Sequence, residues 1–350
     1  MPDSPVAVAG AWADDVSMGF RVADTGDGAV GIRLLPDAPI EGQLEFWRNG
    51  GLWELTARRP PVARMEYLLG LRYADGTVKV TTDPANPLQV AGAFGPKSVL
   101  EFPGYRPPAW LSAPADPGGS RTLELPVLDE VMPVRVWAPA GTRNSDRLPL
   151  LVVHDGPEYD ALARLTRYLG AGIRSRWLPR LRAALLGPGP RNNWYSANAR
   201  YARALWHVVL PALDGRFGVT RRIGMGTSLG ALAMLHAYCR YPGSFDALFL
   251  QSGSFFTPDT DSQERRFPHY RRIIGFTADL RGGGLPARPV PVVATCGQIE
   301  ENVANNRLMT QILRARDYQA VLHEVPDMHN YTAWRDAFDP FLTGLLQRTA

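Results

Sequence analysis

The chain of 350 residues has little lysine and little cysteine. Lysine and arginine together number 38, but only Lys79 and Lys97 are lysines. This arginine excess comes without a basic run or a nucleic-acid-binding motif, so it is more typical of a GC-rich genome than of a nucleic-acid partner. The two cysteines, Cys239 and Cys296, exclude a disulfide framework and are expected to be reduced and buried. The histidines and cysteines also lack metal-ligand spacing, so the sequence predicts no metal and no cofactor.

Long apolar runs are missing as well. No stretch reaches the roughly 18 apolar residues of a membrane span, and the start of the chain, 1–5, lacks the basic and apolar regions of a signal peptide. The sequence therefore predicts a cytoplasmic protein with no membrane partner, and it leaves a homo-oligomer open. With 45% hydrophobic and 21% charged residues, the chain can bury a large core, and its length suits two domains.

The motif that carries most chemistry is Gly-Thr-Ser-Leu-Gly at 226–230, a Gly-x-Ser-x-Gly pattern. It follows the apolar run 222–225 and precedes a helical pattern at 231–235. A serine between a buried strand and a helix occupies a sharp turn that exposes its hydroxyl, which predicts Ser228 as a nucleophile. The N–H of Leu229, at the start of that helix, is the predicted donor to a developing oxyanion. An ordinary glycine-rich turn is the alternative.

A serine nucleophile needs a base, and the chain has six histidines. His329 alone stands in a loop after the strand-like run 320–325 and before a predicted C-terminal helix. That position fits the order Ser, acid, His of α/β-hydrolases, so we predict His329 as the base. The acid is expected after the predicted strand 289–296, where Glu300 and Glu301 both qualify and Glu300 is preferred. Asp327 is a further candidate.

The first third of the chain has no helical period. Short candidate strands recur at 29–34, 43–47, 52–57, 65–73 and 77–82. They predict a β-sandwich, with Trp47 and Trp53 in its core. A surface linker is expected at about 102–119, and from Arg121 a hairpin is followed by alternating helices and strands. That alternation predicts an α/β class with a doubly wound, mostly parallel sheet.

These residues together resemble the enterochelin-esterase-like branch of the α/β-hydrolases. The resemblance rests on the Gly-x-Ser-x-Gly turn at 226–230, called the elbow below, on His329 and on three further segments: Leu-Val-Val-His-Asp-Gly-Pro-Glu at 151–158, Gln-Ser-Gly-Ser at 251–254 and Gly-Gln-Ile-Glu at 297–300. It implies an α/β-hydrolase domain preceded by a smaller all-β immunoglobulin-like domain, which we place at 113–350 and 1–112. It also implies that the acid stands three residues after a glycine, which supports Glu300.

The resemblance further implies a second oxyanion donor after an Asp-Gly pair. Here that residue is Pro157, which has no N–H, so Gly156 or Glu158 is expected to donate instead. Other polar residues follow predicted strands at the rim where ligands bind in such sheets. They are the predicted substrate-binding residues: Asp155, Arg191, Asn193 and Tyr195. The alternatives are a strand-ending turn at Asp155 and a polar loop with its aromatic side chains packed on the core.

The sequence thus predicts a cofactor-free serine esterase that acts on a small-molecule ester through Ser228, His329 and Glu300. By resemblance, the ester is siderophore-like or another small ester. Two alternatives remain at this point. One is an acyltransferase of the same fold that uses a sugar or alcohol acceptor, and the other is a non-catalytic binding protein.

Overall fold

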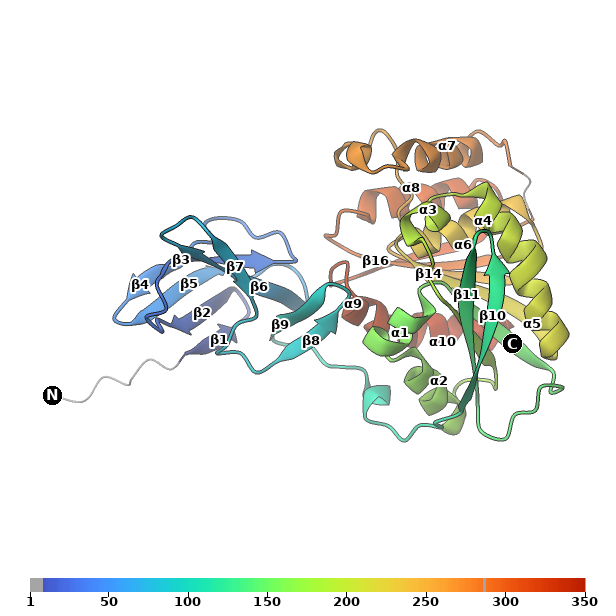
Figure 1. Cartoon of the computed structure of the whole chain (residues 1–350), viewed down its shortest axis with the longest axis horizontal. Coiled ribbons are helices and arrows are strands. Elements are labelled where there is room, and N and C mark those ends of the chain that lie inside the picture. The colour runs from blue at the N-terminus through green and yellow to red at the C-terminus, as the bar shows by residue number, and fades with distance from the viewer. Residues whose placement is uncertain (1–8, 286–287, 350) are drawn as a thin grey trace. The chain divides into compact units, whose positions relative to one another are not determined.

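The computed structural model describes residues 9–285 and 288–349 (Figure 1). Residues 1–5, where the sequence predicts no signal peptide, lie outside the described residues. The chain forms two compact units. The N-terminal unit comprises the chain up to Arg106 together with Gln298–Glu300 and Pro326–Asn330, and the C-terminal unit comprises the remainder. The domain limits 1–112 and 113–350 stay a prediction.

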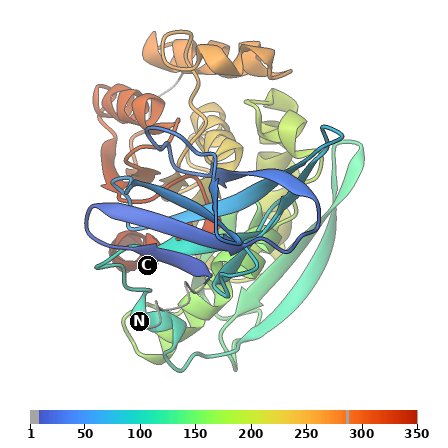
Figure 2. The same ribbon diagram turned by 90° about the vertical axis from the view of Figure 1, so that its left-hand side faces the viewer.

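The N-terminal unit is built from two antiparallel sheets (Figures 1 and 2). The first has the order β1-β2-β5-β4, and the second has the order β3-β6-β9-β8 with β7 paired to β6. Alternate residues of β2, such as Phe20, and of β5, such as Leu55, share one apolar core with Leu34 and Leu69 of the second sheet. The strands are β1 Gly10–Ala13, β2 Ser17–Ala23, β3 Ala29–Pro36, β4 Trp47–Asn49, β5 Leu52–Arg58, β6 Arg64–Tyr73, β7 Val78–Thr81, β8 Gln89–Gly92 and β9 Gly95–Glu101.

Two sequence-based expectations for this unit are wrong. The strand expected at 43–47 does not form over that range. β4 begins only at Trp47, and before it Glu45 forms an isolated β-bridge with Arg33. Trp53 is buried, as predicted, but Trp47 is 47% exposed because it lies on the short edge strand β4. The immunoglobulin-like character of the unit stays a prediction.

The C-terminal unit contains one mixed sheet of eight strands in the order β10-β11-β13-β12-β14-β15-β16-β17. The first two strands form the predicted hairpin, and β13 is antiparallel to β11. All pairings from β13 to β17 are parallel, which confirms the mostly parallel sheet. The strands are β10 Gly119–Val127, β11 Glu130–Ala138, β12 Leu148–Val153, β13 Arg182–Leu186, β14 Val219–Thr227, β15 Ala247–Gln251, β16 Pro291–Gly297 and β17 Gln319–Val325.

Helices cover both faces of this sheet. Leu150 and Val152 of β12 belong to one apolar core, whereas Leu151 and Val153 belong to the other, so the strand is buried on both sides. The helices are α1 Gly156–Ala163, α2 Leu165–Arg174, α3 Arg191–Tyr195, α4 Ala199–Ala204, α5 Leu210–Arg216, α6 Leu229–Arg240, α7 Tyr270–Arg281, α8 Val303–Arg314, α9 Tyr331–Asp336 and α10 Thr343–Thr349. Within the described residues, no helix combines the length and apolarity needed to cross a membrane.

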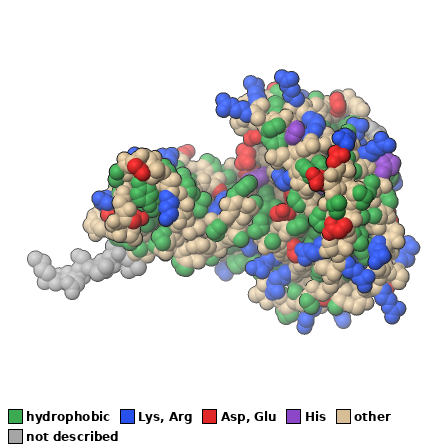
Figure 3. Space-filling view, viewed as in Figure 1, with side chains coloured by type: hydrophobic (Ala, Val, Ile, Leu, Met, Phe, Trp, Pro, Cys, Tyr) green, Lys and Arg blue, Asp and Glu red, His purple; other side chains and the backbone are tan. Residues whose placement is uncertain are grey.

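The segment expected to be a surface linker is partly buried. Residues Ala109–Leu111 form a 3-10 turn, and Trp110 in this turn is only 4% exposed. Its ring packs edge-on against Tyr168 and stacks on Phe338. The proline-rich composition therefore marks an irregular segment, but one whose aromatic residue belongs to the core of the C-terminal unit. Figure 3 shows that basic side chains are scattered over the visible face of this unit.

Candidate active site

Ser228 lies at a strained turn between β14 and α6. Its backbone has φ 54° and ψ −125°, a conformation that is almost restricted to glycine and that persists only where the surroundings impose it. The Ser228 N–H donates to the Gln251 carbonyl at 2.9 Å, and the Ser228 carbonyl accepts from Ser254 N–H at 3.2 Å. A side chain on Gly226 would collide with the Gly230 carbonyl. The two glycines of the motif therefore allow the close approach that this turn requires.

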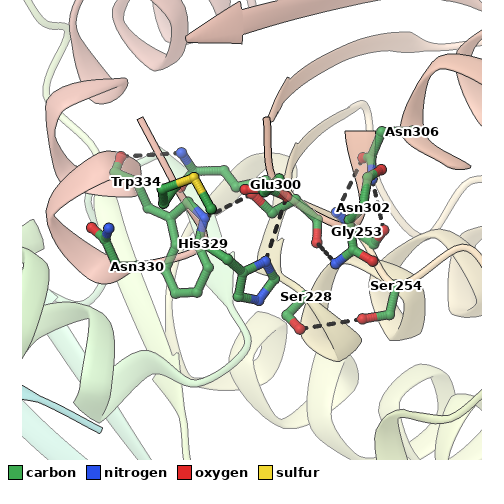
Figure 4. Close-up of polar contacts among 12 residues, drawn as sticks. Ser228, Gly253, Ser254, Glu300, Asn302, Asn306, His329, Asn330 and Trp334 are labelled. Atoms are coloured by element: carbon green, nitrogen blue, oxygen red, sulfur yellow. Dashed lines mark hydrogen bonds and ion pairs between the residues drawn. The ribbon is translucent and has the colours of Figure 1, made fainter. Parts of the chain in front are cut away.

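The hydroxyl of Ser228 has a serine neighbour. Its Oγ lies 3.2 Å from Ser254 Oγ, and Figure 4 shows the two side chains pointing toward each other. Ser254 belongs to the loop after β15. Two asparagines bind this loop: Asn306 of α8, and Asn302, which directly precedes α8. The Asn306 amide both accepts from Gly253 N–H at 3.1 Å and donates to the Gly253 carbonyl at 2.8 Å. Asn302 Nδ2 donates to the Ser252 carbonyl at 3.2 Å.

Sequence reasoning missed this support. The available signal was the group of asparagines at 302, 305 and 306 at the start of a helical pattern. The structure shows that they are buried, and buried amides need hydrogen-bond partners. The loop also receives a bond from Trp334, whose Nε1 donates to Ser252 Oγ at 2.9 Å. The loop that carries Ser254 is therefore fixed from two sides.

His329 and Glu300 form a pair within the N-terminal unit. His329 Nδ1 lies 3.4 Å from Glu300 Oε1, as Figure 4 shows. The Glu300 side chain is fully buried and His329 is 23% exposed, whereas Glu301 is exposed. Asp327 instead lies 3.6 Å from the Arg64 guanidinium and accepts from Met328 N–H. Of the three candidate acids, Glu300 is the one with a described bond to His329.

Asp155 forms the turn at the end of β12. It adopts the left-handed conformation, φ 50° and ψ 37°, directly before α1, and its carboxylate is buried. Arg191 binds it with two parallel bonds, Nε to Oδ1 and Nη2 to Oδ2, both 2.8 Å. Burial lowers the pKa of Arg191, but Asp155 raises it by more, so the net pKa is raised and the pair stays ionic. A side chain on Gly156 would collide with the backbone of Leu185.

The predicted substrate-binding residues are engaged with one another or with the core. Tyr195 is fully buried, and its hydroxyl accepts from Asp155 N–H at 3.3 Å. Asn193 Oδ1 accepts from Arg272 at 3.2 Å and from Asn198 at 3.3 Å. The aromatic residues of α3 therefore pack into the core, which is the alternative that the sequence left open. A role of these residues in substrate binding stays a prediction.

The two residues considered as second oxyanion donors, Gly156 and Glu158, lie in the first turn of α1. Glu158 is half-buried, and burial raises its pKa, with Asp155 adding to the effect. Its Oε2 is buried and has no hydrogen-bond partner among the described residues. Leu229, the other predicted donor, is the first residue of α6. The structure leaves the oxyanion roles of all three as predictions.

His154 contacts the residues behind the elbow. It is completely buried, with Nδ1 2.9 Å from the Gly230 carbonyl and Nε2 2.9 Å from the Tyr201 hydroxyl. Burial lowers its pKa to about 4, so the ring is neutral near pH 7. Nothing in the sequence indicated this supporting contact. Within the described residues, no cluster of three or more His, Cys, Asp or Glu side chains is arranged to hold a metal.

Comparison with known proteins supports an esterase. Residues 126–274 match a family model described as "Putative esterase". A curated relative, the iron(III) enterobactin esterase of Dickeya dadantii (strain 3937), is 30% identical over 133 residues. The matched part covers 35% of this chain and 30% of that relative's length.

Solved structures resemble almost the whole chain. The enterobactin esterase of Shigella flexneri, solved in the presence of enterobactin, has a TM-score of 0.79 at 19% identity, covering 96% of this chain and 94% of that one. The ferric enterobactin esterase of Salmonella typhimurium has a TM-score of 0.75 at 18% identity, covering 95% and 94%. The likeness shows an α/β-hydrolase-like fold with a mixed sheet and a β-rich N-terminal region. The comparisons together support a carboxylic ester hydrolase.

Proposed function

We propose that this enterochelin-esterase-like chain is a serine esterase in which Ser228, His329 and Glu300 act as a catalytic triad. The observation that carries the proposal is the backbone of Ser228. A non-glycine residue in that conformation, between a parallel strand and a helix, is the arrangement that presents a nucleophilic hydroxyl in this fold. The backbone of Ser228 is strained, and strain of that kind concentrates at functional sites.

The order of elements supports the other two members. β14, β16 and β17 run parallel in one sheet, and Ser228, Glu300 and His329 follow their carboxyl ends within a few residues. Ligands bind at that edge of parallel sheets, which is where side chains from different strands can act together. The pairing of His329 Nδ1 with the buried Glu300 leaves Nε2 as the atom that would accept the serine proton.

The proposed reaction has two steps. Ser228 Oγ attacks the ester carbonyl carbon as His329 takes its proton, and the tetrahedral intermediate then expels the alcohol, which receives that proton from His329. Water, deprotonated by His329, attacks the acyl-enzyme, and His329 returns that proton to Ser228 Oγ as the acyl–Oγ bond breaks and the acid is released. The N–H of Leu229 and a donor from the Gly156–Glu158 turn would stabilise the oxyanion, and such a donor typically contributes about 3 kcal/mol.

We propose a small ester as the substrate, with a siderophore-like ester as the first candidate. The support is the likeness to the enterobactin esterases, one of them solved in the presence of enterobactin. A cytoplasmic location is part of the proposal, since two buried cysteines that form no disulfide suit a reducing compartment.

The test compares purified wild type with Ser228→Ala, His329→Ala and, as a matched control, Ser254→Ala. Hydrolysis of p-nitrophenyl esters and of enterobactin is measured, together with labelling by a fluorophosphonate. We expect Ser228→Ala to abolish turnover and labelling, whereas Ser254→Ala keeps the label. Labelling that persists in Ser228→Ala and disappears in Ser254→Ala would identify Ser254 as the nucleophile. Added alcohol that diverts most of the product to a new ester would favour the acyltransferase.

A further inference from the structure

The loops that carry the proposed base and acid are built into the N-terminal β unit. Among the described residues beyond Arg106, only 298–300 and 326–330 cluster with its strands. Ala63 N–H donates to the Pro326 carbonyl at 2.6 Å, and Gln298 Nε2 donates to the Pro61 carbonyl. Met328 is part of the apolar core of this unit. The residues directly before β6 therefore bind the loops that follow β16 and β17.

Arg64, the first residue of β6, makes polar contacts with residues 326–330, which we call the base loop. Its side chain is 2% exposed. Nη1 donates to Asn330 Oδ1 at 3.1 Å and lies 3.6 Å from Asp327 Oδ2, and Nη2 donates to Glu66 Oε1 at 2.8 Å. Asn330 directly follows His329, and Asp327 precedes it by two residues. One planar guanidinium thus binds both sides of the short segment that contains His329.

The partners of Arg64 are themselves connected. Asn330 Nδ2 donates to Asp37 Oδ2 at 3.1 Å and to Asp327 Oδ1 at 3.3 Å. Asp37 Oδ1 accepts from Glu66 N–H at 3.0 Å, and Glu66 Oε2 lies 3.4 Å from Lys97 Nζ. Burial lowers the pKa of Arg64, but Asp327 and Glu66 raise it by more, so its net pKa is raised and it stays charged. A buried network of this kind holds its members rigidly when every group is satisfied.

We infer that Arg64 is a positioning residue for His329, which it holds through Asn330 and Asp327. The inference rests on the proposed function, because it assigns a task only if His329 is the base. It gives the N-terminal unit a role in the chemical step. The unit then supplies the rigid support for the base, and it is more than an appended binding module.

The base loop is expected to move when the Arg64 guanidinium is removed. Removing Arg64 removes the positive charge that Glu66 and Asp327 share. Their buried carboxylates then repel each other, and hydration of the carboxylates becomes favourable. Asn330 also loses the bond that Arg64 donates, so the segment 327–330 is expected to shift or to become mobile. A catalytic group that is misplaced by about 1 Å can cost roughly 100-fold in rate. Such a loss falls on the chemical step, so kcat falls while KM changes little.

The experiment measures kcat, KM and the rate of fluorophosphonate labelling for Arg64→Ala, Arg64→Lys and Asn330→Ala in the full chain. Two controls accompany them: Arg33→Ala removes an exposed arginine from the same unit, and Leu55→Ala destabilises the first sheet of the same unit. We expect Arg64→Ala to lower kcat and labelling 10- to 100-fold with KM within about threefold. Compared with Arg64→Ala, Arg64→Lys should recover more of the stability than of kcat, since a lysine keeps the charge but lacks the planar guanidinium.

A double variant provides the decisive arm. If Arg64 acts through Asn330, the variant that carries both alanines loses no more kcat than the worse single variant. The inference is overturned if folded Arg64→Ala keeps a kcat within twofold of Arg33→Ala. It is also overturned if the loss in every variant, Leu55→Ala included, simply follows the folded fraction measured by circular dichroism. Where Arg64→Ala does not fold, Asn330→Ala decides by the same criteria. Labelling of wild type that depends on Ser228 confirms the proposed function separately, whatever these variants do.

Discussion

His329 Nδ1 lies 3.4 Å from Glu300 Oε1, and the carboxylate is fully buried whereas the neighbouring Glu301 is exposed. A buried carboxylate in that position would fix the imidazole tautomer and stabilise its charged form. We therefore expect Glu300→Gln to lower kcat by about 10²- to 10⁴-fold, the upper limit being the effect known for a protease triad acid. Glu301→Gln is the matched control and should stay within about twofold. Steady-state kinetics on a p-nitrophenyl ester decides, and a larger loss in Glu301→Gln would move the acid by one residue.

The backbone at Ser228 predicts an opposition between stability and activity. Glycine adopts φ 54°, ψ −125° without strain, whereas alanine and serine do not. Both Ser228→Gly and Ser228→Ala should be inactive, but Ser228→Gly should unfold at a higher free energy than Ser228→Ala, by about 1 kcal/mol. Urea denaturation of the two variants measures the difference. Equal stabilities would mean that the turn relaxes in solution.

The sequence predicted the elements of the C-terminal unit better than those of the N-terminal unit. Long apolar runs such as Leu148–Val153 are buried on both faces and have no competing pattern. Short strands such as β1 and β8 of the N-terminal unit have only four residues each, too few for a clear period. Trp47 could not be separated from Trp53 by pattern, because which face of an edge strand is covered depends on the partner sheet.

The candidate site shows the same limit. The order of Ser228, Glu300 and His329 along the chain could be predicted, since each follows a recognisable strand. The support of the site could not, because it depends on contacts between residues far apart in sequence. Arg64 and Asn330, for example, are separated by 266 positions. No local pattern marks such a pair.

The amide of Asn306 holds both the N–H and the carbonyl of Gly253, next to Ser254. In Asn306→Asp the acceptor for the Gly253 N–H is kept, but the donor to the Gly253 carbonyl is replaced by a buried carboxylate oxygen. We expect a loss of about 2 kcal/mol in unfolding free energy and a lower kcat. Asn144→Asp is a control at a half-buried loop position of the same unit. Thermal denaturation and kinetics together check the expectation, and an unchanged melting temperature would show that the loop does not depend on this amide.

The ion pair between Arg191 and Asp155 predicts a contribution to stability. Arg191→Ala leaves the Asp155 carboxylate buried and unpaired, which should cost about 3 kcal/mol, near the lower end for broken buried pairs because Arg191 is 34% exposed. Adding Asp155→Asn should recover part of that stability, since the unpaired charge is removed. A double-mutant cycle in urea measures the coupling. Additive losses would show that the two bonds contribute little in solution.

Asp37, which accepts from Asn330, predicts how stability depends on pH. Burial raises its pKa from 3.8 to about 7, with Glu66 adding to the effect, although Lys97 and Arg64 oppose it. Between those two values the folded state holds a proton that the unfolded state releases, so this group's contribution to stability falls as pH rises toward 7. Asp37→Asn removes that titration. The melting temperature of wild type relative to Asp37→Asn should therefore drop between about pH 4 and pH 7, whereas relative to Asp129→Asn, whose carboxylate is 87% exposed, it should not. A wild-type curve parallel to that of Asp37→Asn across this range would mean that Asp37 stays ionised in the folded protein.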